Sequence, residues 1–220
     1  MQPSADLPTY DEKYFQYQRK IGEIGGWANR HKFKSDIDFQ KNLLDFGCGG
    51  GYLLNYLNLE NKFGIEPNTV ARESAQSFGI TCFNSADEAL TSLGPNSIDQ
   101  IISNHALEHA TNPLHELITL NSLLKPGGSI HFFVPCDSIL NRYKQNDQDM
   151  HLFTWSPQNL ANLFSAAGFR VLYSQKFVHR WPPKYRLFAK LGWPLFNAIS
   201  YIFGHIDRRS FQVQIRATRD

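Results

Sequence analysis

An apolar strand that leads straight into a glycine-rich turn is the feature that most limits how this chain can fold. Residues 43–52 read LLDFGCGGGY, and a helical pattern of apolar residues follows. The glycines at 47, 49 and 51 leave no side chain between the backbone and a ligand, and glycine tolerates the positive φ angles of such a turn. The pattern predicts a strand, a ligand-binding turn and a helix in succession.

Asp45 and Tyr52 separate the candidate ligands of this turn. A carboxylate at the end of the strand repels a pyrophosphate and attracts an ammonium group, such as that of a methionine moiety. The dinucleotide fingerprint G-x-G-x-x-G requires a glycine where this chain has Tyr52. A nicotinamide cofactor is therefore disfavoured. A turn of this kind can also be a tight structural connection that binds no ligand.

Two further strands are expected after the turn. Lys62–Glu66 ends in an acid about 20 residues after the first glycine, where such a sheet places a carboxylate for ribose hydroxyls. The alternative is that Glu66 is a solvated strand end. Pro67 suits the first position of the helix that follows. Ile80–Phe83 is the third expected strand, and the small polar turn at 84–87 can face an adenine edge.

The fourth and fifth expected strands are each preceded or followed by a recognisable motif. Ile98–Ser103 is the fourth strand, and its exit reads NHALEHATNP over residues 104–113. The helix after Pro113 ends at LKPGG, residues 124–128, before a fifth strand at Ser129–Val134. Alternating strands and helices predict a parallel sheet with helices on both faces and a ligand site at the carboxyl ends of the strands.

Three motifs together resemble one enzyme family: D-x-G-x-G-x-G at 45–51, L-E-H-x-x-x-P at 107–113 and L-K-P-G-G at 124–128. The chain resembles the class I S-adenosylmethionine-dependent methyltransferases, in particular the type 11 and type 23 small-molecule group, from Asn42 to Phe177. The resemblance implies an α/β, doubly wound, mostly parallel seven-stranded sheet whose last strand is antiparallel. It implies S-adenosyl-L-methionine as cofactor, bound by Asp45, Gly47, Cys48, Gly49, Gly51, Glu66, Pro67, Ser85, Ala86, Asn104 and His105.

Two other motifs are set aside because their context is wrong. His105–His109 matches the H-x-x-E-H pattern of a zinc peptidase family, but that motif belongs inside a helix and here it starts at a strand exit. No metal is therefore expected. Trp181–Lys184 reads WPPK, yet it lies far from the fourth strand, where the P-P element of amino-group methyltransferases sits. An extruded base or an amide nitrogen is disfavoured as the acceptor.

Three histidines near the expected strand ends are candidates for proton transfer or acceptor binding. His105 and His109 follow the fourth strand, and His151 lies in 149–156, which resembles the acceptor-side segment of the family. Histidine is the side chain best matched to proton transfer at neutral pH. We expect His151, and after it His105, to be catalytic. The alternative for His151 is a structural hydrogen bond to a backbone carbonyl, and His109 is expected to anchor its turn.

Composition favours a single domain, residues 1–220, without an unusual surface. A chain of 220 residues with 42% hydrophobic content can bury one sizeable core. A formal net charge of +2 gives no broad basic field, so no nucleic-acid partner is expected. The three cysteines lie in or beside strands, which suits reduced thiols, and polar residues follow Met1. No secretory signal is visible, and a cytoplasmic protein is expected.

Segments outside the cofactor-binding core, 42–177, have less specific patterns. The N-terminal segment 1–41 shows helical spacing of apolar residues, and one interpretation lets Tyr14, Phe15 or Tyr17 close over the cofactor. The insertion 178–210, before the last strand in 211–220, is aromatic, unusually long and too interrupted to span a membrane. It could be a lid, a dimer contact or a peripheral membrane helix, or it could pack on the domain's own surface.

The expected function is methyl transfer from S-adenosylmethionine to a hydroxyl or amine of a small metabolite, with a sugar or a lipid-linked intermediate as candidates. Positioning the acceptor behind the methyl group would supply most of the rate. A small-molecule acceptor and a monomer or homodimer are expected. Two other functions stay open: a non-catalytic binding protein that uses the same fold, and a NAD(P)-dependent oxidoreductase.

Overall fold

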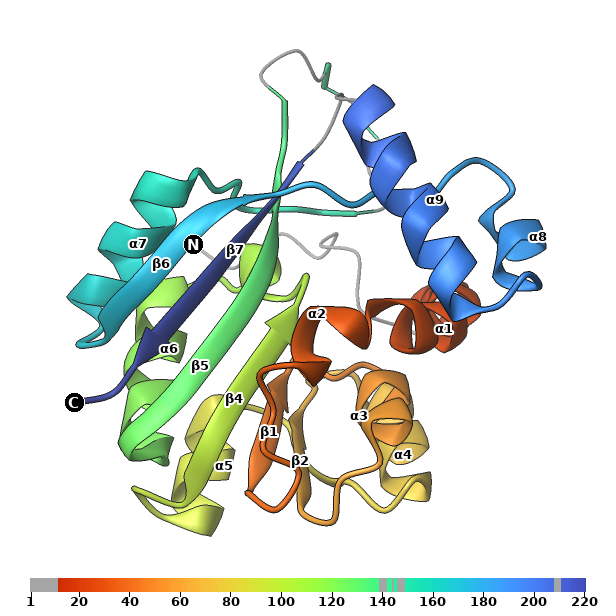
Figure 1. Ribbon diagram of the computed structural model, residues 1–220. Helices are drawn as coiled ribbons and strands as arrows, with labels where there is room; N and C mark the ends of the chain where they lie inside the picture. Colours follow the sequence, from red (N-terminus) through yellow and green to blue (C-terminus); the bar gives the residue numbers. More distant parts are fainter. Residues whose placement is uncertain (1–11, 139–141, 144, 146–148, 208–210) are drawn as a thin grey trace.

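Seven strands form one mixed sheet in the computed structural model, which describes residues 12–138, 142–143, 145, 149–207 and 211–220. The strands are β1 (Leu43–Phe46), β2 (Lys62–Ile65), β3 (Thr81–Phe83), β4 (Ile98–Asn104), β5 (Leu124–Cys136), β6 (Arg170–Phe177) and β7 (Phe211–Thr218). Their order across the sheet is β3-β2-β1-β4-β5-β7-β6 (Figure 1). Strands β1 to β5 pair in parallel, and β7 runs antiparallel to both of its neighbours. The order and the antiparallel last strand confirm the predicted fold class.

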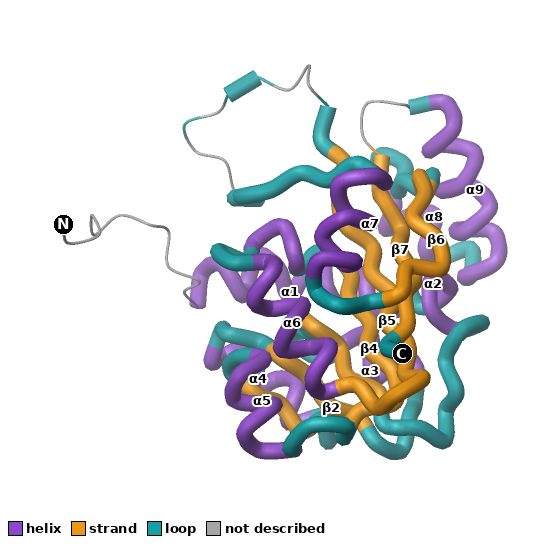
Figure 2. The backbone as a smooth tube through the Cα atoms, turned by 90° about the vertical axis from the view of Figure 1, so that its left-hand side faces the viewer, coloured by secondary structure: helices purple, strands orange, loops and turns teal. Residues whose placement is uncertain are grey.

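Helices cover both faces of the sheet (Figure 1, Figure 2). One face carries α5 (Ala86–Leu93), α6 (Pro113–Leu123) and α7 (Pro157–Ala166), and the other carries α2 (His31–Lys34), α3 (Tyr52–Leu57) and α4 (Thr69–Ser77). Each face has its own apolar core. On the first, Phe132 and Phe164 pack edge to face at 5.6 Å, and on the second Phe33 and Phe133 do so at 5.2 Å. β1 is buried along its whole length, as expected for a central parallel strand.

The start of α7 follows the sequence prediction, whereas the start of α4 does not. Ser156 caps α7 in a reciprocal capping box, with Pro157 in the first turn. Pro67 was expected at the first position of α4, but that helix begins at Thr69, and the prediction is corrected. Asn68 is the N-cap, and its side chain accepts the Ala71 N–H at 3.0 Å, a bond that a proline at the helix start cannot provide.

The fifth strand is longer than expected, because the LKPGG step belongs to it instead of ending the preceding helix. Leu124 pairs with Ile98, and the pairing resumes between Gln100 and Ser129 after a register shift. The N–H of Gly127 donates to the carbonyl of Arg219 at 2.8 Å, which ties the bend to the end of the chain. The expected strand Ser129–Val134 is therefore only the regular part of β5.

The insertion 178–210 is mainly helical in its described part. It contains α8 (Tyr185–Ala189) and α9 (Trp193–Ile206). Phe196 of α9 is fully buried against Trp27 of α1 (Glu12–Asn29), with ring centroids 5.2 Å apart. The predicted N-terminal helix is thus confirmed as α1, but the side chains of Tyr14, Phe15 and Tyr17 lie outside the described residues. Among the helices that the structure describes, none has the length and apolar content needed to cross a membrane.

Candidate active site

A cavity of about 1010 Å³ lies at the carboxyl ends of the central strands, where a parallel sheet of this kind is expected to bind ligands. All of the predicted cofactor-binding residues except Gly51 and Ala86 line it. Ala86 is instead buried in the core at the first turn of α5, and the hydroxyl of Ser85 caps that helix through the Glu88 N–H. Both candidate catalytic residues, His151 and His105, also line this cavity.

In the glycine turn, the backbone packs closely against its neighbours at Gly47 and Gly51 and is open to the cavity at Gly49. Gly47 has a φ of +77° and a Cβ there would collide with the Cβ of Ala106, so no other residue fits. A Cβ on Gly51 would come within 2.8 Å of the Ala75 backbone, which explains why Gly51 supports the turn without lining the cavity. A Cβ on Gly49 would meet no atom within 4 Å, because that position faces open space large enough for a ligand.

The carboxyl groups of Asp45, which is buried, and Glu66, which is half-buried, line the cavity beside the glycine turn. Asp45 is 3% exposed, and burial together with the nearby charge of Glu66 raises its pKa well above the usual range. Burial also raises the pKa of Glu66, partly offset by the N–H groups of Asn68 and Gly49, each 2.9 Å from a carboxylate oxygen. Neither carboxyl group forms an ion pair within the described part of the chain. Such a site fits a ligand with an ammonium group and hydroxyls, as the sequence analysis inferred.

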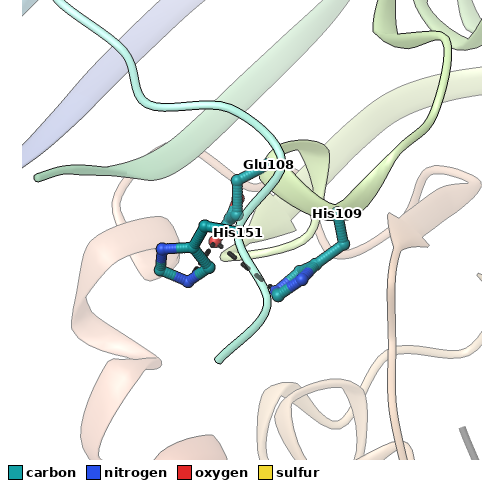
Figure 3. A group of neighbouring side chains, drawn as sticks. All are labelled: Glu108, His109 and His151. Carbon is teal, nitrogen blue, oxygen red and sulfur yellow. Dashed lines mark ion pairs between the residues drawn. The ribbon is translucent and has the colours of Figure 1, made fainter. Parts of the chain in front are cut away.

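Three histidines lie around one buried carboxylate that also lines the cavity, and Figure 3 shows two of them, His109 and His151. Glu108, in the short 3₁₀ helix η1 (Leu107–His109), is fully buried. Its Oε1 lies 3.4 Å from His105 Nδ1, 3.9 Å from His109 Nε2 and 4.0 Å from His151 Nε2. These are ion-pair distances without hydrogen-bond alignment, and neither carboxylate oxygen has a well-aligned partner among the described residues.

The position of His151 is fixed by its neighbours on both sides. The backbone N–H groups of Leu152 and Phe153 donate to the Glu108 carbonyl at 2.9 and 3.2 Å, which holds the loop against η1. His151 Nδ1 lies 3.1 Å from Asp137 Oδ2, just after β5. A carboxylate on one ring nitrogen orients the other, Nε2, toward the cavity-lining Glu108. This arrangement differs from the carbonyl-bonded structural histidine considered as an alternative.

The electrostatics of the cluster favour an ionised Glu108. Burial by itself raises the pKa of Glu108, but His105, by proximity and charge, and then His109 lower it on balance. Burial lowers the pKa of His109. Ligand atoms of Glu108, His109 and His151 also lie within 4.8 Å of one another, so this group could hold a divalent cation, which the sequence analysis did not expect.

Sequence reasoning missed several residues that line the cavity. Lys32 comes from α2, Gln212 from β7, and His179, Arg180 and Trp181 from the first residues of the insertion. Residues of α8 and α9 are not among those found to line it. A buried lysine on a four-residue helix has no local pattern that distinguishes it from a solvated one. The run His179–Trp181 was a visible aromatic signal, but its sequence position did not indicate the strand end to which it returns.

A family model described as a methyltransferase domain, Methyltransf_23, matches residues 10–174, three quarters of the chain. The chain belongs to this family. Within it, the chain is 36% identical over 112 residues to a ubiquinone biosynthesis O-methyltransferase of Vibrio cholerae, covering 47% of this chain and 44% of that protein. A protein of the same name from Vibrio parahaemolyticus is 34% identical over 117 residues, covering 50% and 48%. The match to these curated relatives spans about half of their length.

Solved methyltransferase structures share the fold of this family member over nearly its whole length. A putative methyltransferase in complex with the Haloferax volcanii Trm112 activator has a TM-score of 0.67 at 18% identity, covering 97% of this chain and 99% of that one. A possible histamine N-methyltransferase of Thermotoga maritima has a TM-score of 0.65 at 19% identity, covering 93% and 95%. At such identities the likeness concerns the fold.

Proposed function

We propose that this methyltransferase-family protein transfers a methyl group from S-adenosylmethionine to a hydroxyl or amine of a small metabolite. The observation that carries the proposal is the division of one cavity into two chemically different halves. A pair of carboxyl groups and an open glycine turn lie at one side, and a histidine–carboxylate cluster lies at the other.

The first half suits the cofactor. Asp45 provides a carboxyl group for the ammonium of the methionine part, whose positive charge favours the ionised carboxylate. Glu66 can accept hydrogen bonds from a vicinal diol with the lone pairs that Gly49 and Asn68 leave unused. A pyrophosphate would instead meet two acids, which disfavours the oxidoreductase alternative. The sulfonium supplies an electrophilic methyl group, so the chain's own residues have to orient the acceptor, exclude water and receive a proton.

The second half suits an acceptor that must lose a proton. His151, oriented by Asp137, is our candidate for the group that receives this proton, with His105 as the second candidate. Ionised Glu108 stabilises the positive charge that forms on either imidazole. Hydroxyl groups depend on a base more than amines do, so the cluster favours an oxygen acceptor. The name of the Vibrio relatives agrees with this preference. A sugar or a lipid-linked hydroxyl remains within the proposal.

Calorimetry with two cofactors tests the first half directly. We expect S-adenosylhomocysteine and S-adenosylmethionine to bind, and NAD to give no heat. A screen of metabolites with labelled S-adenosylmethionine then identifies the acceptor by transfer of label. Tight NAD binding without S-adenosylmethionine binding would overturn the proposal. Cofactor binding without turnover of any acceptor in a broad hydroxyl and amine screen would favour the non-catalytic alternative.

A further inference from the structure

Lys32 places a buried positive charge at the wall of the cavity. Its side chain belongs to α2 and the residue is 6% exposed. The ammonium donates to Asn104 Oδ1 and Gln212 Oε1, both at 2.7 Å, and lies 5.0 Å from the ring centroid of Phe133. Within the described ranges it forms no ion pair with a carboxylate. Burying an ammonium without a counter-ion costs free energy. A negatively charged ligand beside Lys32 would offset this cost.

Most of the contacts of Lys32 lie on the strands that we assign to the acceptor side of the cavity. Across the sheet they come from Asn104 at the end of β4, Phe133 of β5, Gln212 of β7 and Phe177 at the end of β6, whose ring centroid is 5.7 Å away. The glycine turn and Glu66 follow β1 and β2, in the other half of the sheet. β4 is the strand next to β1, and Asn104 is itself one of the expected cofactor-binding residues, so the ammonium lies at the border of the cofactor side, with its other contacts on β5, β7 and β6 beyond that border.

The charges around Lys32 leave its ammonium poorly compensated. Burial lowers its pKa to about 7, and among the residues that the structure describes only the charge of Glu108, in η1, acts in the opposite direction. The other titratable groups facing it are histidines: His31 of its own helix, His131 of β5, and His179 after β6. Burial lowers the pKa of each of them, so they are neutral at neutral pH and supply no negative charge.

We propose that Lys32 is a specificity-determining residue that binds a carboxylate of the methyl acceptor. The inference rests on the proposed function and names a substrate class for it: a small hydroxy or amino compound that carries a carboxylate away from the methylated atom. Because Asn104 accepts from the ammonium through Oδ1, its amide Nδ2 donor lies on the same side chain beside the charge. An ammonium with a neighbouring amide donor is suited to a carboxylate, and both aromatic rings beside it favour an apolar body behind that group.

Binding of matched carboxylates and amides tests this inference on the intact protein saturated with S-adenosylhomocysteine. The probes are acetate, benzoate and 3-phenylpropionate, each compared with its uncharged amide. We expect at least one carboxylate to bind tenfold or more tightly than its amide, and the preference to disappear in Lys32→Met. Lys34→Met removes an exposed lysine from the same helix and should keep the preference. Absence of any carboxylate preference in the unmodified protein would overturn the inference.

Two further measurements test whether Lys32 has only a structural role and whether it binds the methionine carboxylate of the cofactor instead of the acceptor. Calorimetry near pH 7 in buffers of different ionisation enthalpy should show proton uptake when the carboxylate binds, and no uptake in Lys32→Met. The ratio of affinities for S-adenosylhomocysteine and 5′-methylthioadenosine, which lacks the methionine carboxylate, should be the same in both proteins. A ratio that falls in Lys32→Met would assign the lysine to the cofactor and overturn the inference.

Failure of this inference can be told apart from failure of the proposed function. If S-adenosylhomocysteine does not bind the unmodified protein, the proposed function fails, whatever the carboxylate probes show. If it binds while the carboxylate preference is missing, only the role of Lys32 fails. A thermal unfolding scan confirms that Lys32→Met is folded before binding is compared, and removal of a buried charge should leave its unfolding temperature unchanged or higher.

Discussion

The N–H of Leu152 donates to the carbonyl of Glu108 at 2.9 Å, and this backbone bond brings the loop after β5 against the turn after β4. The two residues are 44 positions apart in the chain, yet the bond sets His151 beside the Glu108 carboxylate. Because the tether uses backbone atoms, side-chain substitutions in the cluster should change its chemistry without releasing the loop. Variants of the cluster are therefore informative about function.

Replacing His151 or Glu108 should impair turnover more than binding. We expect His151→Ala to lower kcat about 100-fold or more if the acceptor is a hydroxyl, since that is the usual contribution of a positioned base. Glu108→Gln should also lower kcat, because the histidines lose their counter-charge. His115→Ala, which removes an exposed histidine paired with Asp87 outside the cavity, should leave kcat unchanged. Steady-state kinetics with separate kcat and KM provide the test, and unaltered kcat in His151→Ala would rule out its role as base.

The same cluster should take up a divalent cation when one is supplied. Two imidazoles and a carboxylate are good ligands for Co²⁺, and the atoms need to move little to coordinate it. We expect titration with Co²⁺ to give a visible absorption band that chelation abolishes and that is absent from Glu108→Gln. Turnover measured before and after chelation then distinguishes the two roles. Full activity in chelator supports the proton-transfer role, whereas loss of activity that added metal restores would contradict it.

Asp45 should lower the stability of the ligand-free protein and strengthen cofactor binding. Its pKa is raised by burial, so its carboxyl is neutral below that pKa, and a buried charge forms as the pH rises through it. We expect Asp45→Asn to unfold at an equal or higher temperature than the unmodified ligand-free protein, with the gap widening toward alkaline pH. Affinity for S-adenosylmethionine should fall. Asp38→Asn, at an exposed site outside the cavity, should change neither quantity in this way. Tighter cofactor binding by Asp45→Asn would contradict the ammonium assignment.

Glu66 should matter for both the cofactor and the glycine turn. Glu66→Ala removes a hydrogen-bonding charge, and we expect it to weaken S-adenosylhomocysteine binding by about 1.5–3 kcal/mol. It also leaves the N–H groups of Gly49 and Asn68 without acceptors, so the unfolding temperature should fall as well. A solvated strand end would show neither effect. Glu73→Ala, which alters an exposed acid on α4, is the matched control, and calorimetry with thermal unfolding measures both quantities.

Helix α9 should mediate contact with anionic membranes. Leu195, Ile202 and Ile206 are exposed and recur at helical spacing, and the neighbouring helix α8 contains Arg186 and is flanked by Lys184 and Lys190. We expect the protein to float with vesicles that contain phosphatidylglycerol, and the double variant Leu195→Glu, Ile202→Glu to remain unbound. The control Leu114→Glu, Ile118→Glu changes exposed apolar residues of α6 and should still float. Conversion of a dimer to a monomer by the α9 variant, without any vesicle binding, would show a dimer contact instead.

Local sequence patterns were enough to predict the sheet and the glycine turn that lines the cavity, because strand ends and glycine turns are determined within a few residues. The start of α4 was predicted wrongly because two neighbouring residues both favour a helix start. Proline is common at the first helical position, which pointed to Pro67, but the side chain of Asn68 caps the helix and sets its start at Thr69. The arrangement of the histidine–carboxylate cluster and of Lys32 depends on long-range contacts. His151 reaches Glu108 through a loop tether, and Lys32 is buried by strands far along the chain. Neither contact leaves a periodic signal in the sequence.

The collision that a side chain on Gly47 would make with Ala106 links the evolution of the two halves. Ala106 lies between His105 and the Glu108 turn, so a larger residue at this position would push the cofactor turn away from its strand. Position 106 has to stay small for as long as Gly47 holds its present path, whatever residues flank it. In a directed-evolution library, recovered active variants should therefore almost never carry a residue larger than alanine at position 106.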